Sequence, residues 1–126
     1  MTQKLGLVFF PAFDWMISPG HPERQERLLY TRDQLQEEGI FDLPSIREYR
    51  PRLATIRDLQ RVHVGVPSIR KLITPAHLAS AGGCLTAADA VMHGEVERAF
   101  ALVRPPGHHA MLVVHGIRGF CTINIE

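Results

Sequence analysis

Cysteine is scarce in this chain of 126 residues, and neither sign of charge predominates. Two cysteines are too few for a disulfide framework, so a reducing cytoplasm is the expected setting. The formal net charge of +1 gives no reason to expect a nucleic acid or a membrane surface as partner. The apolar run LGLVFF, residues 5–10, is much too short to cross a bilayer and precedes no small-residue cleavage site.

The composition is that of an ordinary globular domain. Hydrophobic residues make up 45% and charged residues 21% of the chain, so neither disorder nor a collagen-like structure is indicated. The length suits one domain with a sizeable core, and no repeat, linker or low-complexity tract divides it. We therefore expect residues 1–126 to belong to a single domain.

Apolar runs alternate with helical patterns along the chain. Strands are predicted at residues 5–10, 45–50 and 99–103. Helices are predicted within residues 21–39, from Thr55, after Pro67 and within residues 78–94. This β-α-β-α-α-α-β order predicts an α/β fold with a mainly parallel sheet.

Local signals mark the ends of these helices. Pro22 suits a first helical position, and Gly39 and Gly94 are suitable stops. Thr55 and Asp58 have the spacing of a capping box, which favours a short helix after Thr55.

The predicted helix at residues 78–94 is unusual in containing adjacent glycines. Gly82 and Gly83 cost helix stability relative to alanine, so close packing against them is expected. The apolar stripe is expected to consist of Leu78, Ala81, Leu85, Ala88 and Met92, with Cys84 filling the core nearby.

The motif RPPGHHA, residues 104–110, follows directly on the last predicted strand. Parallel sheets bind ligands beyond the carboxyl ends of their strands, so this motif lies where such a fold places its chemistry. The two prolines restrict the backbone, and Gly107 can adopt φ values that side chains disfavour. Such a loop aims His108 and His109 together, whereas a strand would send them to opposite faces. A metal site, an acid–base pair and an exposed loop all remain open on these grounds.

Further residues extend this motif into a family pattern. RPPGHHA followed by GFC, residues 119–121, and by Asn124 resembles the histone deacetylase superfamily, which includes acetylpolyamine amidohydrolases and acetoin-utilisation proteins. HPERQERL, residues 21–28, and the stretch from SAGG to RPPGHHA resemble the same family. The resemblance implies an arginase/deacetylase-type α/β fold, a mainly parallel sheet flanked by helices, incomplete in this chain.

The resemblance also implies a chemistry, the hydrolysis of an acetyl-amide such as acetyl-lysine or an acetylpolyamine by a prokaryote-like enzyme. A metal, usually zinc, polarises the amide carbonyl and lowers the pKa of a bound water. By position, His109 would be the main general base and acid and His108 its hydrogen-bonded partner, since imidazole exchanges protons near neutral pH.

Other roles carried over by the resemblance concern binding. Gly119 and Phe120 would line the narrow channel for the acylated side chain, and an aromatic wall suits its methylene stem. Cys121 would lie near the floor of the site. Arg27 would face an internal cavity for the small acid product; its alternative is an ion pair with Glu23 or Asp33 on the helix surface.

The sequence departs from the family pattern in its ligands. The family holds its metal by an Asp-x-His pair and a later Asp, and no Asp-x-His occurs here. We therefore expect an amino-terminal portion of a catalytic domain that is inactive as given. The segment ITPAHLA, residues 73–79, has no carboxylate, which favours a small acylated amine over a histone tail.

Two alternatives to catalysis stay open. One is a truncated, inactive α/β domain that acts as an oligomerising or binding module, since an unfinished sheet exposes an edge strand that favours self-association. The other is a zinc site built from His108, His109, His115 and Cys121, whose ligand types suit the metal although their spacing matches no finger pattern.

Overall fold

The computed structural model describes residues 3–11, 17–64, 66, 70–110 and 121–125. The strands are β1 (Gln3–Phe9), β2 (Ile46–Tyr49) and β3 (Val96–Leu102). The helices are α1 (Gln25–Glu37), α2 (Ile56–Gln60) and α4 (Pro75–Met92), with short 3-10 turns η1 (Ile40–Asp42) and η2 (Arg70–Leu72). No helix in these ranges is long and apolar enough to cross a membrane.

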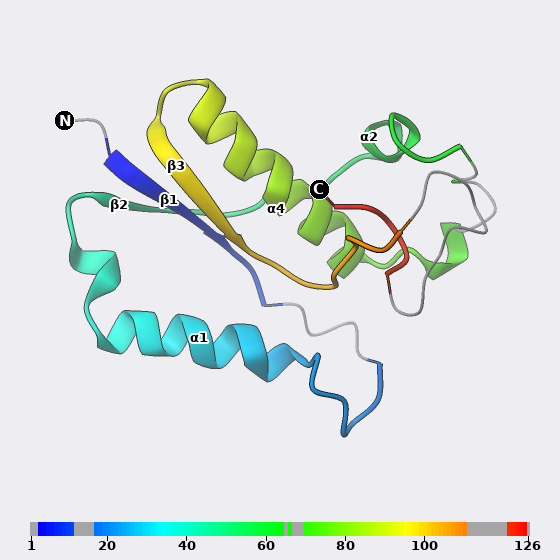
Figure 1. The fold of residues 1–126 in the computed structure, drawn as a ribbon, viewed down its shortest axis with the longest axis horizontal. Coiled ribbons are helices and arrows are strands. Elements are labelled where there is room, and N and C mark those ends of the chain that lie inside the picture. Colours follow the sequence, from blue (N-terminus) through cyan, green and yellow to red (C-terminus); the bar gives the residue numbers. More distant parts are fainter. Residues whose placement is uncertain (1–2, 12–16, 65, 67–69, 111–120, 126) are drawn as a thin grey trace.

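The three strands form one parallel sheet in the order β2-β1-β3. Leu5 of β1 lies between Ile46 of β2 and Arg98 of β3. Helices α1 and α4 lie on opposite sides of the sheet (Figure 1). The parallel pairing confirms the predicted α/β class, because each strand returns to the same end of the sheet through a helical crossover.

Helix α4 lies very close to its neighbours because its contact face is built of small residues. A Cβ on Gly82 would lie 1.7 Å from the carbonyl oxygen of Arg52, and one on Gly83 would lie 2.6 Å from the Val103 side chain. The close packing expected at these two glycines is therefore confirmed. The buried face comprises Ala76, His77, Ala79, Ser80, Ala81, Gly82, Gly83, Ala87 and Ala90.

This face differs from the predicted stripe. Ala88 is exposed and Met92 is 83% exposed, so neither belongs to the core. The prediction holds for Ala81, which is buried, and for Leu78 and Leu85, which pack against the core. It was wrong for Ala88 and Met92 because the helix packs on its neighbours mainly through its small residues, a face that the apolar stripe does not follow. Most of the segment ITPAHLA forms the first turn of α4, where the Thr74 N–H donates to His77 Nδ1 at 3.0 Å.

Helix α1 begins at Gln25, whereas the sequence predicted a start at Pro22. The residue before it, Arg24, has extended backbone with φ −140°, so the preceding HPE segment runs outside the helix. The predicted stops are confirmed, since Gly39 and Gly94 both have φ 71°, in the left-handed region that glycine tolerates best.

Helix α2 packs against a cluster of buried apolar residues. The predicted capping box is present, with the Asp58 N–H donating to Thr55 Oγ1 at 3.1 Å and the Thr55 N–H to Asp58 Oδ2 at 2.9 Å. Buried apolar residues beside α2 come from four separate parts of the chain: Ala54, Leu59, Val66, Ala81 and Ile123. This cluster fixes residues 121–125 against α2 and α4.

Candidate active site

The segment at residues 104–110 leaves the carboxyl end of β3 and begins with a fully buried cation. Arg104 is 0% exposed, and its guanidinium donates to the carboxylate of Glu23, with Nη2 to Oε2 at 2.8 Å and Nε to Oε2 at 3.2 Å. The Glu23 side chain is 13% exposed. Because a buried charge needs a partner, this pair ties the start of the segment to the HPE stretch ahead of α1.

Arg27 meets the same carboxylate from the opposite side. Its Nη2 lies 3.2 Å from Glu23 Oε1, and half of its side chain is exposed. The ion pair offered as its alternative role is therefore present. The role of Arg27 in a product cavity stays a prediction, since neither of the cavities described below has Arg27 in its wall.

The next anchor comes from α4. Ser80 is 0% exposed, and its hydroxyl donates to the carbonyl oxygen of Pro105 at 2.7 Å. The segment is thus held to a helix that is itself packed tightly on the sheet. Its direction is set before the histidines are reached, by the ion pair of Arg104 with Glu23 and by the hydrogen bond from Ser80 to Pro105.

Gly107 is required for a different reason from the one predicted. Its φ is not in the left-handed region, which among described glycines is occupied by Gly39 and Gly94. A Cβ on Gly107 would instead lie 2.0 Å from the carbonyl oxygen of Ile123 and 2.9 Å from the nitrogen of Ile125. The backbone of residues 123–125 passes directly against this glycine, so no side chain fits.

His108 and His109 occupy the turn that follows. The Ala110 N–H donates to the Gly107 carbonyl at 3.0 Å, which closes a four-residue turn with both histidines at its centre. Both histidines are exposed, and their ring centroids lie 4.2 Å apart with the planes tilted by 50°. The prediction that this loop aims the two rings together is confirmed.

Two neighbouring imidazoles are suited to moving protons. Each neutral ring carries one N–H donor and one acceptor nitrogen, so one ring can take a proton while the other holds a hydrogen bond. Exposure leaves both rings accessible to a substrate.

The described residues do not form a metal site. No group of three or more His, Cys, Asp or Glu side chains within these ranges is arranged to hold a metal ion. The two histidines of the turn alone fall short of the four ligands of a structural zinc site or the three of a catalytic one. His115, Gly119 and Phe120 lie outside the described residues, so the zinc-site alternative and the two channel residues stay predictions.

Cys121 lies on the buried side of the segment that supports the turn. It is 1% exposed and makes no disulfide, as expected from the low cysteine count. Three residues further on, the Asn124 side-chain amide donates to the carbonyl oxygen of Ala110 at 3.3 Å. The position of Cys121 is compatible with the floor of a site, a role that stays a prediction.

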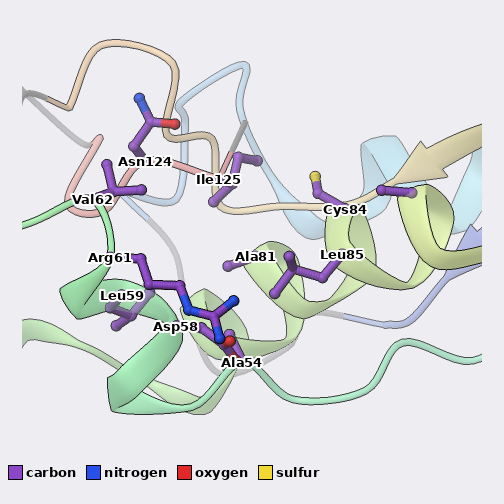
Figure 2. A pocket seen from close by; sticks show the side chains of 11 residues that line it. Ala54, Asp58, Leu59, Arg61, Val62, Ala81, Cys84, Leu85, Asn124 and Ile125 are labelled. Carbon is purple, nitrogen blue, oxygen red and sulfur yellow. The ribbon is translucent and has the colours of Figure 1, made fainter. Parts of the chain in front are cut away.

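Described residues line a cavity beside α2 and another beside β1 and β2, and neither of these has His108 or His109 in its wall. One, of about 240 Å³, opens between α2 and α4, where Figure 2 shows Ala81, Cys84 and Leu85 of α4 facing the α2 side with Asn124 and Ile125 nearby. The other, of about 560 Å³, lies beyond the carboxyl ends of β1 and β2 beside Phe9, Arg32 and Arg50.

Comparison with known proteins decides the family. The family model for the histone deacetylase domain matches residues 65–125. A probable deacetylase of Archaeoglobus fulgidus is 41% identical over an aligned length of 125 residues. The match covers 85% of this chain and 34% of that protein. The chain belongs to the histone deacetylase superfamily. Histone deacetylase 15 of Arabidopsis thaliana is 33% identical over 82% of this chain and 22% of its own length.

The fold is that of the same superfamily. The crystal structure of the HDA15 HD domain superposes with a TM-score of 0.80 at 27% identity, over 99% of this chain and 41% of that one. The chain thus spans about a third of the length of its archaeal relative and less than half of the solved deacetylase domain. A shorter match, 47% identical over 36% of this chain, is to polyamine deacetylase HDAC10 of Mus musculus, of which it covers 6%.

Sequence reasoning found the histidine pair and missed most of what holds it. Glu23 was expected only as an ion-pair partner of Arg27, Ser80 and Asn124 were named only as parts of family motifs, and His63 was given no role. The ion pair between Glu23 and Arg104 could have been suspected from the sequence. Glu23 is the carboxylate of the HPE motif and Arg104 is the arginine of RPPG, and both belong to motifs of the family.

Proposed function

We propose that this chain forms the amino-terminal part of a deacylase that hydrolyses an acetyl-amide, with His109 as the main general base and acid and His108 as its partner. The observation that carries the proposal is the pair of exposed imidazoles, 4.2 Å apart, on an anchored turn at the carboxyl end of β3. The superfamily's relatives that bear the name deacetylase support the reaction class.

The reaction needs two proton transfers that one imidazole can perform in sequence. Neutral His109 takes a proton from water as the water oxygen attacks the acetyl carbonyl carbon. The carbon–nitrogen bond then breaks, and the same proton passes from the imidazolium to the leaving amine. The products are an amine and acetic acid, and the acid loses the second proton of the water to solvent as acetate. His108 holds a hydrogen bond to its neighbour and responds to the charge that forms there.

Zinc dependence belongs to the proposal through family likeness alone. Because the described residues contain no set of three metal ligands, no step of the reaction is derived through a metal. We likewise propose a cytoplasmic setting, which the low cysteine count supports.

The substrate class is an acetyl-lysine side chain or an acetylpolyamine, and both remain in the proposal. Relatives named polyamine deacetylase and histone deacetylase match this chain at similar identity, 47% and 49% over about a third of it. The lack of a carboxylate in residues 73–79 favours the smaller amine, and the helical position of residues 75–79 leaves this argument unchanged.

The test joins residues 1–126 to the remaining part of the Archaeoglobus fulgidus relative and measures acetate release. An acetyl-lysine peptide and an acetylated polyamine are offered in parallel, and bound zinc is measured on the same preparation. We expect hydrolysis of at least one substrate and a loss of about 100-fold or more in His109→Ala. The matched control is His93→Ala, an exposed histidine at the end of α4. Equal rates in the two variants would exclude the proposed role.

A non-enzymatic oligomerising module is the second candidate, favoured by the outer edge of β3. Among described residues β3 pairs only with β1, and Phe100, opposite Leu7, is 58% exposed. We propose that this edge promotes self-association. Light scattering of the chain should show dimers or larger species that Phe100→Lys reduces; a monomer at moderate concentration counts against it.

A further inference from the structure

We infer that His63 is a positioning residue for the histidine pair, acting through the backbone of residues 121–125. Its importance for catalysis rests on the proposed function, whereas the contact itself does not. His63 follows α2 directly, is 4% exposed, and lies 61 residues from the atom that it binds. Neither the family motif nor the residues singled out from the sequence include it.

The first step is an unusual use of a histidine side chain. The backbone N–H of Asn124 donates to Nε2 of His63 at 2.8 Å. Nε2 can accept only when it carries no proton, so the ring is neutral with its hydrogen on Nδ1. A buried backbone N–H requires an acceptor, and in this segment, which forms no regular strand, the imidazole supplies it.

The second step passes from Asn124 to the turn. While its backbone is held by His63, the side-chain amide of Asn124 donates to the carbonyl oxygen of Ala110 at 3.3 Å. Ala110 is the residue that closes the turn around His108 and His109. One residue therefore joins the ring of His63 to the loop that carries the proposed base.

The third step is steric. The carbonyl oxygen of Ile123, the residue before Asn124, lies only 2.0 Å from the position that a Cβ of Gly107 would take, so the two backbones are in close contact. Residues 107 and 110 thus both rest on residues 123–124, and a shift of that strip moves both ends of the turn. His63 fixes the position of residues 123–124 through its hydrogen bond with the Asn124 N–H, and it therefore acts on the histidine pair indirectly.

The test compares three substitutions at His63. In His63→Gln, the amide oxygen can reach the position of Nε2; in His63→Asn it falls short, and His63→Leu offers no acceptor. Amide exchange at Asn124 and the resonances of His108 and His109 are followed by NMR on the whole chain. We expect about tenfold or faster exchange and shifted ring resonances in the Leu and Asn variants, with both restored in His63→Gln.

Two results would overturn the inference. The first is that the amide exchange rate at Asn124 and the ring resonances of His108 and His109 are the same in all three variants as in the unsubstituted chain. The second is that these quantities change equally in the Gln and Leu variants, which would mean that His63 only fills space. Should the variants fail to fold, the unsubstituted chain decides the matter. A scalar coupling across the hydrogen bond from the Asn124 N–H to His63 Nε2 supports the inference, and its absence refutes it.

Catalysis gives an independent readout in the joined chain described above. His63→Leu should lower kcat about tenfold with little change in KM, because ground-state binding is untouched while the base is misplaced, and His63→Gln should recover most of the rate. If the joined chain is inactive with His63 in place, the proposed function fails, and the exchange and coupling measurements still judge the positioning role.

Discussion

Within residues 104–110, the first four residues and the two histidines that follow lie in opposite surroundings. Arg104, Pro105 and Gly107 are buried against α4, the HPE segment and residues 121–125. His108 and His109 project from the turn and are exposed. We call residues 104–107 the base of the motif, in the sense of its support, and His108 and His109 its tip. The base is largely buried, and the tip is exposed to solvent.

The difference separates stability from chemistry. The side-chain contacts described at the base join it to distant parts of the chain, Glu23 and Ser80, so changes there act on folding first. The tip is exposed, so changes there should act on proton transfer rather than on folding. Substitutions on each side can sharpen or break this division.

The largest loss of stability is expected from Glu23→Gln at the base. The substitution keeps the volume and leaves the buried guanidinium of Arg104 without its carboxylate, which should lower the free energy of unfolding by about 4 kcal/mol. Urea unfolding measures the change. The control is Glu26→Gln, since Glu26 pairs with the exposed Arg24 and its substitution should leave the free energy of unfolding nearly unchanged. Similar losses in both variants would contradict a buried base.

The next effect is expected from Gly107→Ala. The added methyl group meets the backbone of Ile123 rather than a side chain that could turn away, so the cost should be about 2 to 3 kcal/mol. Gly20→Ala is the matched control, because nothing lies within 4 Å of its Cβ position and its φ is ordinary. Thermal melts of the two variants should separate clearly; coincident melts would mean that residues 123–125 do not rest on Gly107.

The smallest effect concerns the support of the base by α2 and depends on pH. The hydrogen bond from the Thr55 N–H, with that from Arg52, lowers the pKa of Asp58 from 3.8 to about 2. An acid with a depressed pKa stabilises the folded state above its unfolded value and loses this contribution as pH falls through the folded value. The Tm deficit of Asp58→Asn should therefore be present at about pH 5 and shrink between about pH 4 and pH 2. A deficit that does not vary with pH would exclude this account of the cap.

Much of the fold was predictable because its signals are local. Apolar runs predicted all three strands, and their alternation with helices predicted the parallel sheet that the structure confirms. The start of α1 and the face of α4 were wrong, since both depend on contacts with other segments. The HPE segment is drawn out of α1 toward Arg104, and α4 lies so close to the sheet that alanine and glycine form its core face.

The site divides in the same way. His108 and His109 are adjacent in sequence, so a rigid loop was enough to predict that their rings lie together. The contacts that hold their loop join distant residues: Arg104 binds Glu23, 81 residues away, and Asn124 binds His63, 61 residues away. No pattern within one segment could reveal such pairs, because they form only when the sheet brings the segments together.

The most direct test measures Tm and acetate release on one preparation of His109→Ala in the joined chain. The account predicts a Tm within about 2 °C of the unsubstituted protein, because the ring is exposed, together with a rate reduced about 100-fold or more. A retained rate, or a rate that falls only in proportion to lost folded protein, would contradict the assignment of this turn as the proton-carrying part of a deacylase.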